Sequence, residues 1–401
     1  MLIDLHMKDV GPAEEMSIAF KPRMNFITGA DELDKTFLLD VAWWALTRTW
    51  ARGPFIPRSF PATPRLSYLT AGAGRAYDAG FDRWSDTWGK DQGPDRFTDL
   101  VLYARVDGGV SVCEPTRSDD HQYAFHFTAD ELWHGNDASE GLIRDWASWQ
   151  REGGDPYSRL MWVLKALSPS PAHPLRAGDV RRISINDPKH YPTLAMPYGE
   201  DVPIIHASAG MRRIISLVYA LIWLWQEHLD ACKLFGREPN RQIVFLIDEI
   251  EAHLHPQWQR RIVPALLDVM KALTGEDGIS VQFITVTHSP LVLASAEPDF
   301  DPDRDAIWTL DLDDAEFRRR VRTLTDREVP RVIQNKRKQV GVRIPDHPVT
   351  QAITQALGRP LISTTAARPG QDPDPDPRFV DTTFPEVELV LDAGACGLTP
   401  T

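Results

Sequence analysis

The chain has 401 residues, of which 42% are apolar, and its formal net charge is −13. This composition excludes a disordered chain, and the length suits two or three domains or one large domain with insertions. Because the chain as a whole repels phosphate, a nucleic-acid partner would require a local basic face.

The sequence shows no features of a secreted or membrane-spanning protein. Its cysteines, Cys113, Cys232 and Cys396, are too widely spaced for a metal-binding pattern or a disulfide framework. The N-terminal residues include acids and lack the apolar stretch of a signal peptide. The longest apolar helix that we expect, residues 214–225, is too short to span a bilayer. We therefore expect a cytoplasmic protein without a membrane partner.

A candidate phosphate-binding loop lies near the N-terminus. The chain reads as a strand that ends at Gly29, a loop, and a helix over residues 37–50 with apolar residues at helical spacing. Gly29, Lys35 and Thr36 match the pattern G-x-x-x-x-G-K-[ST], whose backbone N–H groups and lysine hold phosphates. An acidic surface turn is the alternative interpretation.

Two acidic residues depart from this pattern. Asp34 occupies the position of the second glycine, and Glu32 adds a charge of the same sign. A carboxylate beside a phosphate costs roughly 3 kcal/mol, on the order of a hundredfold in affinity. We therefore expect the loop to bind a nucleotide weakly.

The middle of the chain is expected to contain a β-rich part and then a helical part. Residues 97–105 and 110–113 read as strands around the turn Asp107-Gly108-Gly109. Residues 132–167 read as mostly helical, and their tryptophans suit a core better than a base-stacking surface. We expect a helical insertion over about residues 130–200.

A second candidate anion site lies at the start of the next helix. Ser208-Ala-Gly210 precedes a long apolar helix over residues 211–229. A serine at a helix start leaves backbone N–H groups and the positive end of the helix dipole available to an anion. An ordinary capped core helix is the alternative.

Two later strands deliver polar residues to their carboxyl ends. Residues 243–248 are apolar without alternation up to Asp248, which predicts a strand buried on both faces of a parallel sheet. Asp248 and Glu249 therefore lie where α/β sheets bind ligands. A second apolar strand, residues 279–285, is followed by Thr287-His288-Ser289-Pro290. A helix is expected between the two strands, over residues 257–273.

The segment from Asp248 to Pro256 resembles the Walker B and D-loop segment of ABC-type, AAA-like ATPase heads in the RecF/SMC/OLD-like group. The resemblance extends through His253 and His255. It implies an α/β fold for residues 1–315, namely a P-loop NTPase head of ABC type with β-rich and helical insertions.

The other motifs resemble parts of the same family. Residues 29–36 resemble its Walker A motif, Ser208-Ala-Gly210 its signature motif with Arg213 or Arg212 as the basic residue, and His288 its switch histidine. The residues implied to bind ATP are Gly29, Lys35, Thr36, Ser208 and Gly210. The residues implied to hold Mg²⁺ are Thr36 and Asp248, and those implied to be catalytic are Glu249, which would orient water, and His288.

A second resemblance covers the C-terminal part of the chain. After a junction at residues 316–326, residues 327–401 resemble part of a YrdC/YciO-type domain, the fold of threonylcarbamoyl-AMP synthases. The N-terminal half of such a domain, which carries most of its substrate contacts, is absent. We therefore expect no enzymatic activity from this segment alone.

The resemblances imply an ATP-binding ATPase that dimerises head to tail when it binds ATP and acts in DNA repair or anti-phage defence, with DNA or an effector protein as a partner. Two alternatives remain. The altered loop favours a pseudo-ATPase scaffold that does not hydrolyse ATP, and the C-terminal segment favours a YrdC/YciO-like protein that binds nucleotide or RNA.

Overall fold

A computed structural model describes residues 1–310, except 12–13, 30–34, 56–62, 86, 90–98, 118–122, 171–173, 241 and 275–279, together with the backbone of residues 317–319. The chain divides into two units, Met1–Val321 and Arg322–Thr401. The second unit, which contains the YrdC/YciO-like segment, lies outside the described residues.

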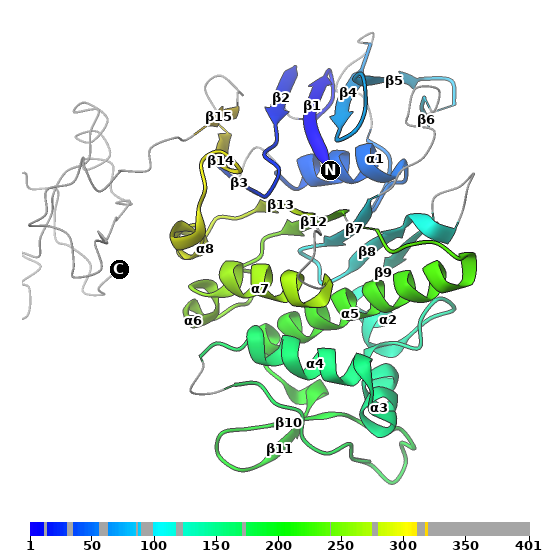
Figure 1. The fold of residues 1–401 in the computed structure, drawn as a ribbon, viewed down its shortest axis with the longest axis vertical. Coiled ribbons are helices and arrows are strands. Elements are labelled where there is room, and N and C mark those ends of the chain that lie inside the picture. The colour runs from blue at the N-terminus through cyan, green and yellow to red at the C-terminus, as the bar shows by residue number, and fades with distance from the viewer. Residues whose placement is uncertain are drawn as a thin grey trace, which may run out of the picture. The chain divides into compact units, whose positions relative to one another are not determined.

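An eight-stranded sheet forms the centre of the first unit (Figure 1). In the order in which they pair, its strands are β15 (Phe317–Arg319), β14 (Asp305–Leu310), β3 (Met24–Gly29), β13 (Ser280–Val286), β12 (Gln242–Asp248), β7 (Leu100–Ala104), β8 (Val110–Glu114) and β9 (Tyr123–Phe127). The five strands from β14 to β7 are parallel, whereas β15, β8 and β9 pair antiparallel at the edges. This topology confirms the predicted α/β fold.

The continuous apolar sequence of β12 follows from its central position. Val244 and Leu246 belong to the core on one face of the sheet, and Phe245 and Ile247 belong to the core on the other. Successive side chains of a strand point to opposite faces, so a strand covered on both faces needs apolar residues at every position.

Helix α1 (Lys35–Thr47) lies between the central sheet and a second, five-stranded sheet (Figure 1). The strands of this sheet, in pairing order, are β2 (Glu15–Ala19), β1 (Leu2–Lys8), β4 (Arg65–Thr70), β5 (Tyr77–Asp82) and β6 (Thr87–Trp88). Except for Thr36, the residues of α1 are buried, including Lys35 and Asp40. A helix enclosed on all sides needs no polar face.

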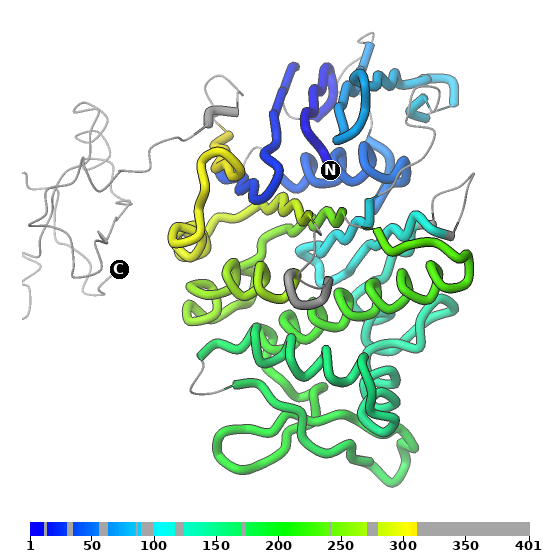
Figure 2. The backbone as a smooth tube through the Cα atoms, viewed as in Figure 1, coloured from blue at the N-terminus to red at the C-terminus, as the bar shows by residue number. Residues whose placement is uncertain are grey.

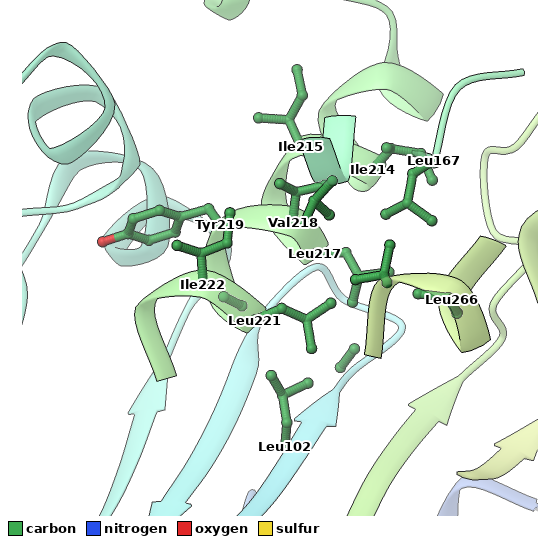
Figure 3. Packing of buried hydrophobic residues seen from close by; sticks show 14 of the residues in the cluster. Leu102, Leu167, Ile214, Ile215, Leu217, Val218, Tyr219, Leu221, Ile222 and Leu266 are labelled. Carbon is green, nitrogen blue, oxygen red and sulfur yellow. The ribbon is translucent and has the colours of Figure 1, made fainter. Parts of the chain in front are cut away.

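Helices cover the opposite face of the central sheet. They are α2 (Ala129–His134), α3 (Leu142–Glu152), α4 (Asp155–Ala166), α5 (Ala209–Phe235), α6 (Pro256–Gln259), α7 (Ile262–Thr274) and α8 (Pro290–Ala296). Figure 3 shows Leu217 and Leu221 of α5 near Leu102 of β7 and Leu266 of α7. Among the described residues, no helix has both the length and the apolar character that crossing a bilayer requires.

The structure differs from the sequence analysis in two helical regions. The helix expected over residues 257–273 is interrupted after Gln259, because Pro264 has no N–H to donate to the preceding turn. The helical insertion expected to about residue 200 is helical only to Ala166. Beyond it, the described residues of 174–203 contain two short strands, β10 (Thr193–Ala195) and β11 (Asp201–Pro203). Figure 2 shows this segment at the end of the unit opposite the five-stranded sheet.

Candidate functional site

The predicted site residues of the first unit lie around the carboxyl ends of the central strands of the eight-stranded sheet. Strands β3, β13 and β12 are parallel, so Gly29, Asp248 and the residues that follow Val286 lie at the same end. Helix α1 begins at the same end of the sheet, directly after the loop that follows β3. The carboxyl ends of parallel strands form the usual ligand-binding crevice of an α/β sheet.

Two residues predicted to hold Mg²⁺ are in contact. The Thr36 hydroxyl donates a hydrogen bond to the Asp248 carboxylate, with distances of 2.9 Å to Oδ2 and 3.1 Å to Oδ1. Beside them, Lys35 Nζ donates to the Gly29 carbonyl at 3.1 Å. The structure thus brings Lys35 back to Gly29, the first residue of the predicted phosphate-binding loop. Glu32 and Asp34 lie outside the described residues.

Gly29 is required by a close approach between two strands. Its φ is +142°, and a Cβ atom there would lie 2.5 Å from the Leu310 carbonyl oxygen of β14. Any larger residue would separate β3 from β14. This packing accounts for the glycine without reference to a ligand.

The Asp248 carboxyl group is fully buried. Burial raises its pKa from the ordinary value of 3.8 to about 6; the Thr36 hydrogen bond and Arg52 oppose this effect, and Glu249 and Asp40 add to it. A cation at the carboxylate would offset the cost of its buried charge.

The residues at the site fit a magnesium ion. No cluster of three or more histidine, cysteine, aspartate or glutamate side chains arranged for a metal occurs in the described part of the chain. The protein therefore offers one carboxylate and one hydroxyl, from Asp248 and Thr36. Such a small set of oxygen ligands suits Mg²⁺, which keeps several waters and is often bound by one or two carboxylates together with substrate phosphates.

A group of residues that sequence reasoning missed lies behind Asp248. Arg52 Nη2 is 2.8 Å from Asp40 Oδ2 and donates to the Tyr103 hydroxyl at 3.3 Å. The guanidinium is one positive charge that offsets the buried Asp40 and Asp248 carboxylates, and Arg213 brings another near Asp248. The sequence did hold one indication that Asp40 belongs to this group. Asp40 follows Thr36 by four residues and therefore lies on the same face of α1.

The chain turns sharply directly after Asp248. Glu249 is half-buried and adopts a left-handed conformation with φ of +46°, and His253 does the same with φ of +63°. A left-handed conformation is uncommon for residues other than glycine, and residues held in it often occur at functional sites. Among the described residues, four residues other than glycine have a positive φ, and Glu249, which is predicted to orient water, is one of them.

Glu251, which sequence analysis did not single out, holds the loop that contains His288. Its Oε1 accepts hydrogen bonds from the backbone N–H groups of His288 at 2.5 Å and Ser289 at 3.1 Å. Its Oε2 accepts from the Thr287 hydroxyl at 2.7 Å. One carboxylate therefore joins the turn after β12 to the loop after β13. The His288 side chain itself is exposed.

The start of α5 is also joined to the turn after β12. Gly210 is buried, and a Cβ atom there would lie 2.6 Å from the His253 carbonyl oxygen. Arg213 donates to the Arg105 carbonyl at 2.5 Å and to the Asp248 carbonyl at 3.2 Å. Gly210 therefore has a packing role within the chain that the sequence did not reveal.

Ser208 caps α5. Its hydroxyl accepts a hydrogen bond from the Met211 N–H at 3.3 Å. The residue is exposed, in contrast to Gly210. The predicted signature motif thus has a buried half, which packs on the chain, and an exposed half at the helix start.

Comparison with known proteins agrees with both resemblances. Residues 114–294 match a family model described as AAA domain, putative AbiEii toxin, Type IV TA system. Residues 320–400 match the Sua5/YciO/YrdC model, described as Telomere recombination. The first match begins after the loop at residues 29–36, so the roles of Gly29, Lys35 and Thr36 stay predictions.

Individual proteins resemble parts of the chain. The uncharacterized protein YciO of Escherichia coli (strain K12) is 40% identical over 78 residues, which are 19% of this chain and 38% of YciO. The retron Vc95 probable ATPase of Vibrio cholerae serotype O1 biovar El Tor is 31% identical over 118 residues, which are 29% of this chain and 21% of that protein. The chain therefore spans less than half the length of either relative.

A solved structure also aligns with the chain. The SMC head domain from Thermotoga maritima is 13% identical, covers 77% of this chain and 95% of its own, and has a TM-score of 0.38. The sequence matches thus relate residues 114–294 to AAA-type ATPase domains and residues 320–400 to the Sua5/YciO/YrdC family.

Replacing Asp248 by Asn should stabilise the nucleotide-free protein in a pH-dependent way. The folded-state pKa of about 6 exceeds the ordinary value of 3.8. The cost of the buried charge is therefore absent below 3.8, grows between the two values and is complete above 6. Asparagine removes the charge and keeps an oxygen for Thr36. We expect the free energy of unfolding to rise by on the order of 1–3 kcal/mol at pH 8 and by about half as much at pH 5.

Urea unfolding at both pH values measures this difference. The matched control is Asp268→Asn, which alters an exposed carboxyl group on α7 and should have a small effect at both pH values. A gain for Asp248→Asn that does not depend on pH would contradict the assignment.

Replacing Glu251 by Ala should free the loop after β13. The His288 N–H and the Thr287 hydroxyl lose their acceptor, whereas the Ser289 N–H keeps the Thr287 hydroxyl oxygen at 3.1 Å. Hydrogen exchange at His288 should therefore accelerate at least tenfold, as measured by mass spectrometry of a peptide covering residues 287–292. Glu251→Gln keeps one oxygen for the N–H groups and should have a smaller effect. Unchanged exchange in Glu251→Ala would show that the carboxylate does not hold the loop.

Proposed function

We propose that this chain, whose residues 114–294 match an AAA-domain model, binds ATP with Mg²⁺ at the site formed by Lys35, Thr36 and Asp248 and hydrolyses it slowly. The observation that carries this proposal is the contact between the Thr36 hydroxyl and the Asp248 carboxylate. Thr36 and Asp248 lie 212 positions apart in the sequence, and the fold brings them together beside Lys35 at the carboxyl ends of the central strands.

In this proposal the chain acts by positioning and electrostatics rather than by covalent chemistry. When ATP binds, the Lys35 ammonium group would give up its hydrogen bond to the Gly29 carbonyl and donate to phosphate oxygens instead. Mg²⁺ supplies charge neutralisation when it is bound, with Thr36 and Asp248 as its protein ligands. Asp248 must then be ionised, and its pKa of about 6 permits this at neutral pH.

The residues that follow β12 and β13 would act on the attacking water and the γ-phosphate. Glu249, which has an unusual backbone conformation directly after Asp248, would orient the water. His288, on the loop that Glu251 holds, would contact the γ-phosphate. Both roles come from the family resemblance. The positions of Glu249 and His288 after the carboxyl ends of two neighbouring parallel strands support them.

The exposed start of α5 supports a head-to-tail dimer. The backbone N–H groups at a helix start attract anions, and Ser208 is exposed there. In a dimer, Ser208 of one subunit would meet the γ-phosphate of ATP held by the other. The contacts of Gly210 and Arg213 would hold this helix start in a fixed position relative to Asp248.

The biological setting that the relatives suggest is anti-phage defence or DNA repair, with an effector protein or DNA as a partner. One relative is named a retron probable ATPase, and the matching family is described as a putative AbiEii toxin. The competing proposal is a pseudo-ATPase scaffold that does not hydrolyse ATP, which the acidic residues at positions 32 and 34 favour because they weaken nucleotide binding.

The adjacent acids Asp248 and Glu249 should have separable roles. Glu249→Gln keeps an oxygen and loses the base, so ATP should stay bound and dimers should accumulate. Asp248→Ala removes a Mg²⁺ ligand and should weaken retention of Mg²⁺-ATP. Nucleotide retention on a filter and mass by light scattering measure the two effects.

The control for the dimer is Ser208→Arg in the Glu249→Gln background. It should prevent ATP-dependent dimers while the monomer stays folded. A dimer that survives this change would place the interface elsewhere. Equal loss of nucleotide binding in Glu249→Gln and Asp248→Ala would show that the two acids do not have separate roles.

A further inference from the structure

A cavity of about 420 Å³ lies between α3 and the segment at residues 188–190. Figure 1 shows α3 on the far side of α5 from the central sheet and α1, so this cavity is separate from the site around Asp248. Five basic side chains line it, namely His134, Arg144, Arg151, Lys189 and His190. Such a concentration contrasts with the net charge of −13 of the chain.

The two acidic side chains that line the cavity are engaged within the protein. Glu140 Oε2 accepts a hydrogen bond from Arg144 Nη1 at 2.9 Å. Asp145 Oδ2 accepts one from the Tyr219 hydroxyl at 2.7 Å. Burial also raises the pKa of Asp145, although the Tyr219 hydrogen bond opposes this effect. Neither acid neutralises the bases at residues 151, 189 and 190.

Three of the bases form no direct ion pair, although Lys189 lies close enough to the Asp187 carboxylate for its charge to lower the pKa of that group. Arg151, Lys189 and His190 form no ion pair with any residue in the described part of the chain. Arg151 Nε donates to the Ala147 carbonyl at 2.9 Å, which holds the side chain along α3. The two terminal nitrogens of its guanidinium thus stay available to a ligand.

The segment that carries Lys189 and His190 is held in place before any ligand binds. Asp187 Oδ1 accepts a hydrogen bond from the Lys189 N–H at 3.0 Å, and Asp187 Oδ2 accepts one from the Tyr191 hydroxyl at 2.6 Å. The bases therefore converge on the cavity from a helix and from a fixed loop. Fixed positions lower the entropy that binding would otherwise cost.

We propose that this cavity binds a phosphate-bearing ligand, either a free nucleotide or the phosphorylated end of a nucleic-acid strand. The bases that form no direct ion pair favour an anionic ligand. Arginine guanidinium groups match the geometry of phosphate oxygens. The volume lies within the range of small-molecule sites and exceeds what a single small anion fills.

Binding to the full-length chain tests the proposal, with AMP and fluorescent single-stranded DNA carrying either a 5′-phosphate or a 5′-hydroxyl as probes. Lys189→Glu, and independently Arg151→Gln, should weaken binding at least tenfold. The matched control is Lys165→Glu, an exposed base on α4 that does not line the cavity and should change affinity less than twofold.

The probes distinguish the two sources of phosphate. Binding of AMP alone identifies a free nucleotide as the ligand, and a preference for the 5′-phosphate strand identifies a strand end. The proposal is overturned if neither AMP nor the 5′-phosphate strand binds, if the hydroxyl strand binds equally well, or if Lys165→Glu weakens binding as much as Lys189→Glu. Lys35→Ala should disable the proposed ATP site and leave this binding unchanged, so failure of either proposal is recognised separately.

Discussion

The buried Asp248 carboxylate is the constraint on which the candidate site depends. It lies at the end of the central strand β12, where apolar cores cover both faces of the sheet. A charge in such a place is costly, and the surrounding residues limit the cost. Thr36 donates a hydrogen bond, and Arg52 brings a positive charge nearby. The same arrangement positions the start of α1 against the end of β12, which is what a site for a metal and a phosphate requires.

Three contacts connect Asp248 and the segment that follows it to the rest of the site. Arg213 bonds to the Asp248 carbonyl, Gly210 packs on the His253 carbonyl, and Glu251 holds the loop that contains His288. All three involve the short segment after β12. The start of α5 and the loop after β13 are therefore fixed relative to the segment that carries the two acids. In the proposed mechanism, this segment is the structural link between the nucleotide and a second subunit.

Much of this arrangement was predictable from the sequence because it is local. The apolar residues 243–248 predicted β12, and the spacing of Gly29, Lys35 and Thr36 predicted the strand, loop and helix around them. The contribution of Arg52 and Glu251 was not predictable, because each acts across elements that are distant in sequence. The packing of Gly210 against the His253 carbonyl was not predictable for the same reason, and its predicted role in binding ATP stays a prediction. The interruption near residue 260 had a visible cause in Pro264, which the apolar periodicity of residues 257–273 concealed.

The central claim is that Thr36 and Asp248 form a Mg²⁺-dependent nucleotide site. Calorimetric titration with ATP tests it most directly, in the presence of Mg²⁺ or of EDTA, for the wild type and for Thr36→Val. The same titrations in a Glu32→Gly/Asp34→Gly background keep the site measurable if the acids weaken it. The account predicts that binding requires Mg²⁺ and that Thr36→Val weakens it at least tenfold. Absence of binding in both backgrounds, or binding that depends on neither Mg²⁺ nor the Thr36 hydroxyl, would contradict it.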